Sequence, residues 1–372
     1  MTSAEPPIPF FRPALPPLDD YVGLLREIWE SRMLSNFGTF AQRLEQLAAE
    51  YLGAPHVLSV VSGDIGLIVT LTALELPPGS PCFVSGFTFN STINAALWAD
   101  LRPVLVDIDP DTFTMDPDEL AAALERWTGP GVILATHAFG NPCDSDRLRA
   151  LAREHDCYLV FDAAHGYGSQ RAGTPVGRLG DAEVFSLSGT KLVTTAEGGL
   201  VATPHDWLAE RIAYLRAYGF QHDYESLYVG INGKISELHC ALGLLTLAGV
   251  EDAVQRRAEI LAAYRARLGD KVGWQYVRPS DRSTYKDISI RLGEHREAVE
   301  RSLTAGGVQT KRYFLPLHSM KPYACFADGP LPQTESTYET TLCVPAFSEL
   351  DEATLDRVAR LILEGVEAAA DR

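Results

Sequence analysis

The chain has 372 residues, 46% hydrophobic and 22% charged, which is enough for two or three domains with full cores. Its 32 basic and 49 acidic residues give a net charge of −17, which argues against nucleic acid and anionic membranes as partners. The sequence has no run of about 18 apolar residues and no basic leader followed by an apolar stretch. We therefore expect a cytoplasmic protein without a membrane segment.

The first twenty residues are rich in proline, which predicts an extended arm rather than a helix. From residue 56, short apolar runs alternate with longer amphipathic segments. We expect strands at 56–61, 81–85, 103–109, 131–137 and 157–165, and helices at 66–76, 90–99, 117–127 and 146–155. Strands that are apolar throughout and separated by helices indicate a parallel sheet covered on both faces.

Beyond residue 180 the pattern changes. Two short strands are expected at 183–188 and 198–203, followed by a helix-rich stretch over 205–269. The segments 274–279, 285–292, 294–307 and 311–318 then predict a smaller α+β unit, which closes with a helix over 350–369. We expect a large α/β domain over residues 1–250 and a small C-terminal α+β domain over 251–372.

The six cysteines are dispersed, with no C-x-x-C pair and no histidine at metal-binding spacing. This pattern favours buried free thiols and predicts no metal site.

Open parallel sheets bind ligands at the carboxyl ends of their strands, so the residues that follow each strand are candidates for a site. Gly63 and Asp64 follow the first strand, where they form either an anion site at a helix N-terminus or a plain turn with Asp64 as the cap. Phe89 follows the second strand and either stacks on a flat ligand or packs under a loop.

Two further segments carry ionisable groups. Asp162 ends an apolar strand, where a carboxylate is costly unless it meets a cation, such as a protonated pyridine nitrogen, or caps the next turn. Lys191 lies in a turn rich in hydroxyl groups, and burial there would lower its pKa and make it a nucleophile for Schiff-base chemistry. Ser186 adds a hydroxyl that suits a phosphate ester.

The segments SGD-I-GL, FTF, HAFGNPCD, FDAAHGYG, FSLSGTK and EGG occur in this order along the chain. In type and spacing they resemble the DegT/DnrJ/EryC1/StrS family of sugar aminotransferases, from about residue 13 to the last helix. The resemblance implies the fold-type-I architecture of pyridoxal-phosphate (PLP) aminotransferases. It also implies a homodimer with the cofactor at the subunit interface, and a role in deoxysugar biosynthesis such as antibiotic biosynthesis.

The resemblance also assigns roles to matching positions. Lys191 would hold the cofactor and move the proton, and Asp162 would face the pyridine nitrogen. The other implied cofactor contacts are His165 near the 3-hydroxyl, Phe89 on the ring, Ser186 with the backbone of Gly63 and Asp64 at the phosphate, and Asn232 reaching the phosphate of the neighbouring subunit.

Two positions depart from the usual family pattern. Asp64 stands where the family has Thr or Ser, so we expect its side chain to turn away from the phosphate as a helix cap. His165 replaces a glutamine found in many members and is interpreted as tolerated. Related dehydratases carry His in place of the lysine, so the presence of Lys191 favours transamination.

The sequence is most similar to the branch that aminates C4 of dTDP-4-keto-6-deoxyglucose to give dTDP-4-amino-4,6-dideoxyglucose, with L-glutamate as the expected donor. Alternatives are a 3-keto sugar or a keto cyclitol as substrate, or a non-catalytic PLP-binding regulator. The expected contacts to sugar and nucleotide come from one segment, with Lys311, Arg312, Tyr313, Phe314 and His318. Plain aromatic packing is the alternative for the aromatic residues, and a solvated charged face is the alternative for the two basic residues.

Overall fold

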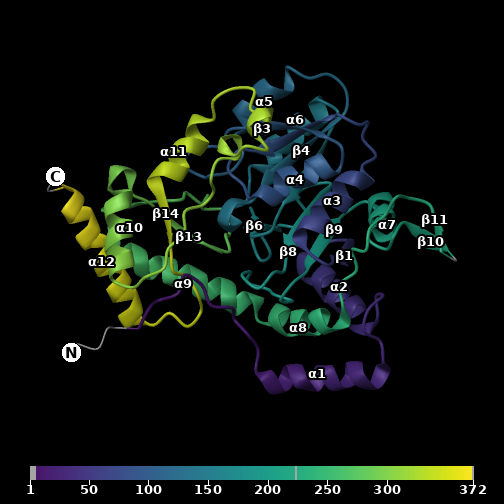
Figure 1. The fold of residues 1–372 in the computed structure, drawn as a ribbon, viewed down its shortest axis with the longest axis horizontal. Helices are drawn as coiled ribbons and strands as arrows, with labels where there is room; N and C mark the ends of the chain where they lie inside the picture. Colours follow the sequence, from purple (N-terminus) through teal and green to yellow (C-terminus); the bar gives the residue numbers. More distant parts are fainter. Residues whose placement is uncertain (1–5, 223, 371–372) are drawn as a thin grey trace.

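The computed structural model describes residues 6–222 and 224–370 (Figure 1). A seven-stranded sheet with the order β1-β9-β8-β5-β4-β2-β3 forms its centre. The predicted strands are confirmed with small shifts at their ends, and the strand at 81–85 is matched at both ends. The strands are β1 (His56–Val60), β9 (Gly199–Thr203), β8 (Ala182–Ser186), β5 (Cys157–Asp162), β4 (Gly131–Thr136), β2 (Pro81–Ser85) and β3 (Arg102–Val106).

Only one strand of this sheet runs against the others. β9 pairs antiparallel with both β1 and β8, whereas the remaining neighbours pair in parallel. The loop 187–198 between β8 and β9 contains no crossover helix, so the chain turns back on itself. The prediction of a mostly parallel sheet is confirmed, and the carboxyl ends of the parallel strands share one edge.

Helices cover both faces of the sheet. One face packs against α3 (Gly63–Ala73), α4 (Asn90–Trp98) and α7 (Asp206–Leu215). The other packs against α2 (Thr39–Leu52), α5 (Pro117–Leu124), α6 (Ser145–Glu154) and α8 (Glu237–Ala248). Within β5, Val160 belongs to the first core and Phe161 to the second. Because both faces are buried, the strands are apolar throughout rather than alternating.

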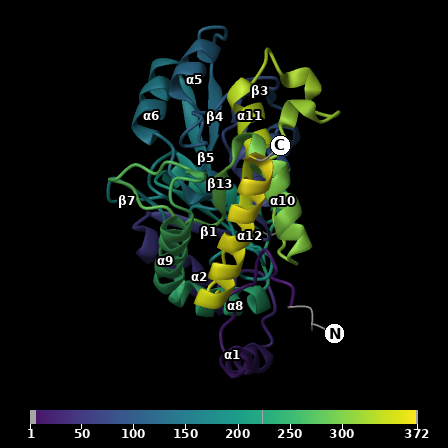
Figure 2. The same cartoon turned by 90° about the vertical axis from the view of Figure 1, so that its left-hand side faces the viewer.

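A second, smaller sheet lies in the C-terminal part of the chain. β12 (Gly273–Trp274), β13 (Ile288–Arg291) and β14 (Thr341–Val344) pair antiparallel. A third core joins them to α9 (Val250–Leu268), α10 (Arg296–Ala305) and α12 (Glu352–Ala370), at one side of the large sheet (Figures 1 and 2). We retain the division at residue 250 as a proposal; α9 begins there.

Several elements were not predicted. The extended arm ends at Leu18, where α1 (Leu18–Ser31) begins, and the first five residues of the predicted arm lie outside the described part of the chain. α1 packs beside α8, below the sheet in Figure 1. The others are α2, α11 (Pro332–Thr340), and the short pairs β6 (Gln170–Arg171) with β7 (Thr174–Pro175) and β10 (Phe220–His222) with β11 (Glu225–Ser226).

Across the described residues, the helices are all too short or too polar to cross a lipid bilayer.

The N-terminus of α2 is capped by a residue that is distant in sequence. Gly38 precedes the helix and offers no side chain, but the buried carboxylate of Glu237 accepts hydrogen bonds from the backbone N–H groups of Phe40 at 2.7 Å and Ala41 at 3.3 Å. The charge suits the positive end of the helix dipole. Glu237 is the first residue of α8, so one carboxylate joins two helices.

We predict that Glu237→Ala lowers the free energy of unfolding by about 1–3 kcal/mol, because two buried N–H groups lose their acceptor. A lower urea midpoint with an unchanged slope would report the loss. Glu27→Ala, at an exposed position of α1, is the matched control and should leave the midpoint in place. Equal midpoints for the two variants would contradict the prediction.

Candidate active site

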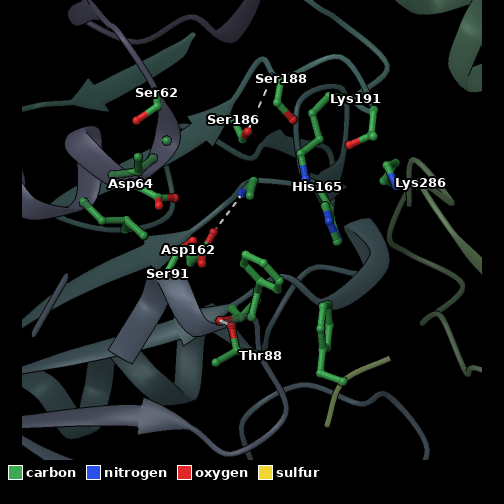
Figure 3. Close-up of a pocket in the computed structure, with 18 of the residues that line it drawn as sticks. Ser62, Asp64, Thr88, Ser91, Asp162, His165, Ser186, Ser188, Lys191 and Lys286 are labelled. Atoms are coloured by element: carbon green, nitrogen blue, oxygen red, sulfur yellow. Dashed lines mark hydrogen bonds between the residues drawn. The ribbon is translucent and has the colours of Figure 1, made fainter. Parts of the chain in front are cut away.

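The carboxyl edge of the large sheet borders a cavity of about 340 Å³. Its walls come from the segments after β1, β2, β4, β5 and β8, together with residues of the C-terminal half (Figure 3). This is the edge at which parallel sheets bind ligands. The structure brings most of the predicted cofactor residues together here: Gly63, Asp64, Phe89, Asp162, His165, Ser186 and Lys191.

Lys191 lies in the irregular loop between β8 and β9, where its N–H donates to the carbonyl of Ser188 at 3.0 Å. Burial is the main cause that lowers the pKa of its ammonium to about 8, and the nearby Lys286 lowers it further, against the opposing effect of neighbouring carboxylates. The neutral, nucleophilic amine is therefore a minor form near neutral pH, but one far more populated than at the ordinary lysine pKa.

Asp162 is 5% exposed at the end of β5 and faces the same cavity. One carboxylate oxygen accepts from the N–H of Ala164 at 3.1 Å, and the other accepts from the hydroxyl of Thr92 at 2.6 Å. Burial raises the pKa of this carboxyl group, while the two hydrogen bonds and Lys191 oppose the rise. A cation bound in the cavity would stabilise the ionised form further.

The imidazole of His165 lines the cavity and stacks on Phe139 and Phe314, with ring centroids 6.3 Å apart in each pair. Burial, Lys191 and Lys286 hold its pKa well below the ordinary value, so the ring is neutral. Within the described chain its buried Nδ1 has no hydrogen-bond partner. A buried nitrogen without a partner is costly, which points to a polar group supplied by a ligand.

The first turn of α3 forms another wall. Ser62 caps this helix by accepting from the N–H of Ile65 at 3.2 Å. A Cβ atom at Gly63 would lie 3.1 Å from the Cβ of Ser186, so the position is held to glycine by close packing. The next N–H groups of the helix have no intrahelical partner and, with the hydroxyl of Ser186, suit an anion.

The expectation for the side chain of Asp64 was wrong. Ser62 takes the cap, so Asp64 falls inside the first turn, and its carboxylate lines the cavity (Figure 3). Its charge acts on both Asp162 and Lys191. The helix begins two residues earlier than the cap interpretation required, so the side chain of Asp64 does not cap it.

Three aromatic rings border the cavity. Phe89, at the cap position of α4, is 58% exposed and can present its ring to a flat ligand. Tyr313 and Phe314 line the cavity from the C-terminal half of the chain. Phe314 is buried in a cluster with Phe87 and Phe139, so this residue both packs against other aromatic rings and lines the cavity.

Four predicted residues lie outside the cavity lining. The guanidinium of Arg312 is held by Glu300, and His318 pairs with Glu335 at 2.8 Å. Lys311 is exposed and its backbone pairs with that of Cys343. Asn232 is exposed beside Ala217. The substrate and partner contacts expected of these residues stay predictions.

Sequence reasoning missed Lys286. Its ammonium lies 2.8 and 3.0 Å from the two carboxylate oxygens of Asp287, both side chains are buried, and Lys286 lines the cavity. The sequence does contain an indication of this pair, because two opposite charges stand next to each other at the start of an apolar strand. Burying an unpaired charge there would be costly.

The model of the DegT/DnrJ/EryC1/StrS aminotransferase family matches residues 19–363. The chain belongs to this family.

Several relatives of this aminotransferase carry the names of nucleotide-sugar enzymes. GDP-perosamine synthase of Caulobacter vibrioides is 32% identical over 364 residues, which cover 94% of this chain and 97% of the relative. dTDP-4-amino-4,6-dideoxy-D-glucose transaminase of Escherichia coli is 29% identical over 368 residues, covering 96% and 98%. The crystal structure of DesI in the presence of its TDP-sugar product has a TM-score of 0.91 at 33% identity and covers 98% of this chain and 95% of that chain.

Aminotransferases of this family use pyridoxal 5′-phosphate, and the cavity fits that cofactor. The fit rests on three features. They are the buried nitrogen of His165 that lacks a partner among the described residues, the closely packed helix N-terminus at Gly63, and the low-pKa amine of Lys191. These groups suit a phenolic oxygen, a phosphate ester and an aldehyde respectively.

We predict that Lys191 in the cofactor-free aminotransferase reacts with an amine-selective acylating reagent with an apparent pKa of about 8 rather than the ordinary 10.5. Only the neutral amine reacts, so the rate at Lys191 should rise through pH 8, as followed by peptide mass spectrometry. Lys286→Gln removes a like charge and should shift the rise to higher pH, whereas exposed Lys321→Gln should not. A rise near pH 10.5 in the unsubstituted protein would contradict the prediction.

Proposed function

We propose that this chain transfers an amino group from L-glutamate to C4 of a nucleotide-linked 4-keto-6-deoxy sugar. The proposal rests on one observation: the amine of Lys191 and the carboxylate of Asp162 line the same cavity in a member of this aminotransferase family. The two named relatives and the DesI complex support a nucleotide sugar as the substrate.

The cofactor would be held at several points. Lys191 would bond it through Nζ, Asp162 would face the ring nitrogen, and His165 would form a hydrogen bond with the 3-hydroxyl. The ring of Phe89 would stack on it. The N–H groups of Gly63 and Asp64 and the hydroxyl of Ser186 would hold the phosphate. The Asp64 carboxylate opposes this binding, because a second negative charge at the cavity repels the phosphate.

The bound cofactor supplies an electron sink that stabilises a carbanion. The amine of Lys191 removes the proton from the donor carbon and returns one to the sugar carbon. Its lowered pKa suits both tasks, because a base with a pKa near the working pH gives up and takes up a proton readily. The ionised Asp162 keeps the ring nitrogen protonated, which the electron sink requires.

We propose that the substrate enters beside Tyr313 and Phe314, whose rings line the wall of the cavity. A hexose and a nucleobase both present flat faces that stack on aromatic rings. Diphosphate contacts from Lys311 and Arg312 remain part of the proposal, and Arg312 would have to leave Glu300 to make one.

A homodimer with shared sites completes the proposal. α1 carries exposed apolar side chains, with Leu18 72% and Trp29 65% exposed, as does the segment after β11, with Val229 97% exposed. Exposed apolar side chains of this size in these two regions are the support for a contact with another molecule. Asn232, in the second of these regions, would then reach the phosphate in the partner's site.

The nucleotide has two candidates. We propose dTDP, supported by the E. coli transaminase and by the TDP-sugar bound to DesI. GDP is the second candidate, because the Caulobacter relative at 32% identity is a GDP-perosamine synthase.

We predict that the PLP-loaded enzyme, mixed with dTDP-4-amino-4,6-dideoxyglucose, converts its cofactor to pyridoxamine phosphate, as read by absorbance. Lys191→Ala should slow this step by at least about 10²-fold, because the proton-transfer group is lost. Lys321→Ala, which changes an exposed lysine, is the control and should not slow it.

The same assay with GDP-perosamine decides the nucleotide. Faster conversion by the GDP sugar would replace dTDP with GDP. Conversion only by 3-amino sugars or amino cyclitols would overturn the proposed C4 chemistry while leaving the aminotransferase in place.

A further inference from the structure

A chain of buried hydroxyl groups begins at Asp162 and includes Thr88 and Thr136, which also line the cavity. The hydroxyl of Thr92 is 2.6 Å from the carboxylate, the hydroxyl of Thr88 is 2.7 Å from that of Thr92, and the hydroxyl of Thr136 is 2.8 Å from that of Thr88. All three threonines are buried, with exposed fractions of 1% for Thr88, 0% for Thr92 and 7% for Thr136.

Three elements of the sheet edge bring these residues together. Thr136 ends β4 directly opposite Asp162 at the end of β5, in the register of the parallel pair. Thr88 lies in the segment after β2, and Thr92 lies in the first turn of α4. The hydroxyls therefore come from a strand, a loop and a helix, and their hydrogen bonds lead to one carboxylate.

The direction of the hydrogen bonds follows from the charge. An ionised carboxylate only accepts, so Thr92 must donate to it. A hydroxyl has one proton, so the oxygen of Thr92 can then only accept from Thr88, and Thr88 in turn accepts from Thr136. Every hydroxyl of the chain points its proton toward Asp162, and each bond polarises the next.

We propose that Thr136, Thr88 and Thr92 form a donor chain that keeps Asp162 ionised and fixed in orientation, and that Thr92 is its essential positioning residue. This inference rests on the proposed role of Asp162 at the cofactor ring nitrogen. The other carboxylate oxygen accepts from the N–H of Ala164, so each oxygen retains a lone pair for a group in the cavity.

The donors are needed because the surroundings are not uniformly favourable to the charge. Burial favours the neutral carboxyl group, and the carboxylate of Asp64 acts in the same direction. Lys191 favours the ionised form, but its ammonium is itself easily deprotonated. A neutral Asp162 could not hold a proton on the ring nitrogen by charge, so the Thr92 hydroxyl bears on the chemistry of the cofactor.

The test uses the full-length enzyme loaded with pyridoxal phosphate labelled with ¹⁵N in the ring. The ¹⁵N chemical shift reports whether the ring nitrogen is protonated, and a titration of the cofactor gives its dissociation constant. Thr92→Val keeps the shape of the side chain but removes the hydroxyl that donates to Asp162. Thr92→Ser retains a hydroxyl and lacks only the methyl group. Thr70→Val is the matched control: Thr70 is fully buried in α3 and its hydroxyl has no hydrogen-bond partner within the described residues.

We expect Thr92→Val to shift the ¹⁵N signal toward the unprotonated position and to weaken cofactor binding by about 10- to 100-fold, as for a lost hydrogen bond to a charged group. Thr92→Ser and Thr70→Val should resemble the unsubstituted enzyme. Unchanged signal and binding in Thr92→Val would overturn the inference, as would a Thr92→Ser enzyme that behaves like Thr92→Val, since that outcome assigns the effect to the methyl group.

Asp162→Asn separates this inference from the proposed function. An Asp162→Asn enzyme whose ring nitrogen stays protonated would overturn the role of Asp162 itself. A changed signal in Asp162→Asn with an unchanged one in Thr92→Val would overturn only the donor chain. If Thr92→Val does not fold, Thr88→Val interrupts the chain one bond further away and should produce a smaller shift in the same direction.

Discussion

Burying the carboxylate of Asp162 at the end of β5 is costly unless donors and a cation surround it. The sheet edge supplies the donors, from Ala164 in the turn after β5 and from Thr92 on α4. The cavity supplies the place for the cation, with Lys191 across it. A mostly parallel sheet makes this possible, because the carboxyl ends of its strands meet and bring residues distant in sequence to one point.

The sequence alone was sufficient for the sheet, because strands buried on both faces are short continuous apolar runs, as at 81–85. It was insufficient where structure depends on distant partners. α11 begins where the side chain of Asp107, after β3, accepts hydrogen bonds from the N–H groups of Gln333 and Thr334. α2 depends in the same way on Glu237. The reversal of β9 was also not visible, since a buried antiparallel strand has the same apolar composition as a parallel one.

Several residues that line the cavity were predictable because they end or follow a strand and are chemically unusual there, as Asp162 and Lys191 are. The donor chain was not, since a threonine near a strand end has many ordinary roles and only the fold brings Thr136 within reach of Thr88. The Asp64 side chain was misjudged because the choice of helix cap between Ser62 and Asp64 depends on local backbone geometry that composition does not determine.

We propose that Lys191, and not Lys286, holds the cofactor. The direct measurement is reduction of the PLP-loaded enzyme with borohydride, followed by peptide mapping to locate the residue that carries the reduced cofactor. We expect the label on Lys191. A label on Lys286, whose ammonium is paired with Asp287 and should be unreactive, or no label on either lysine, would contradict it.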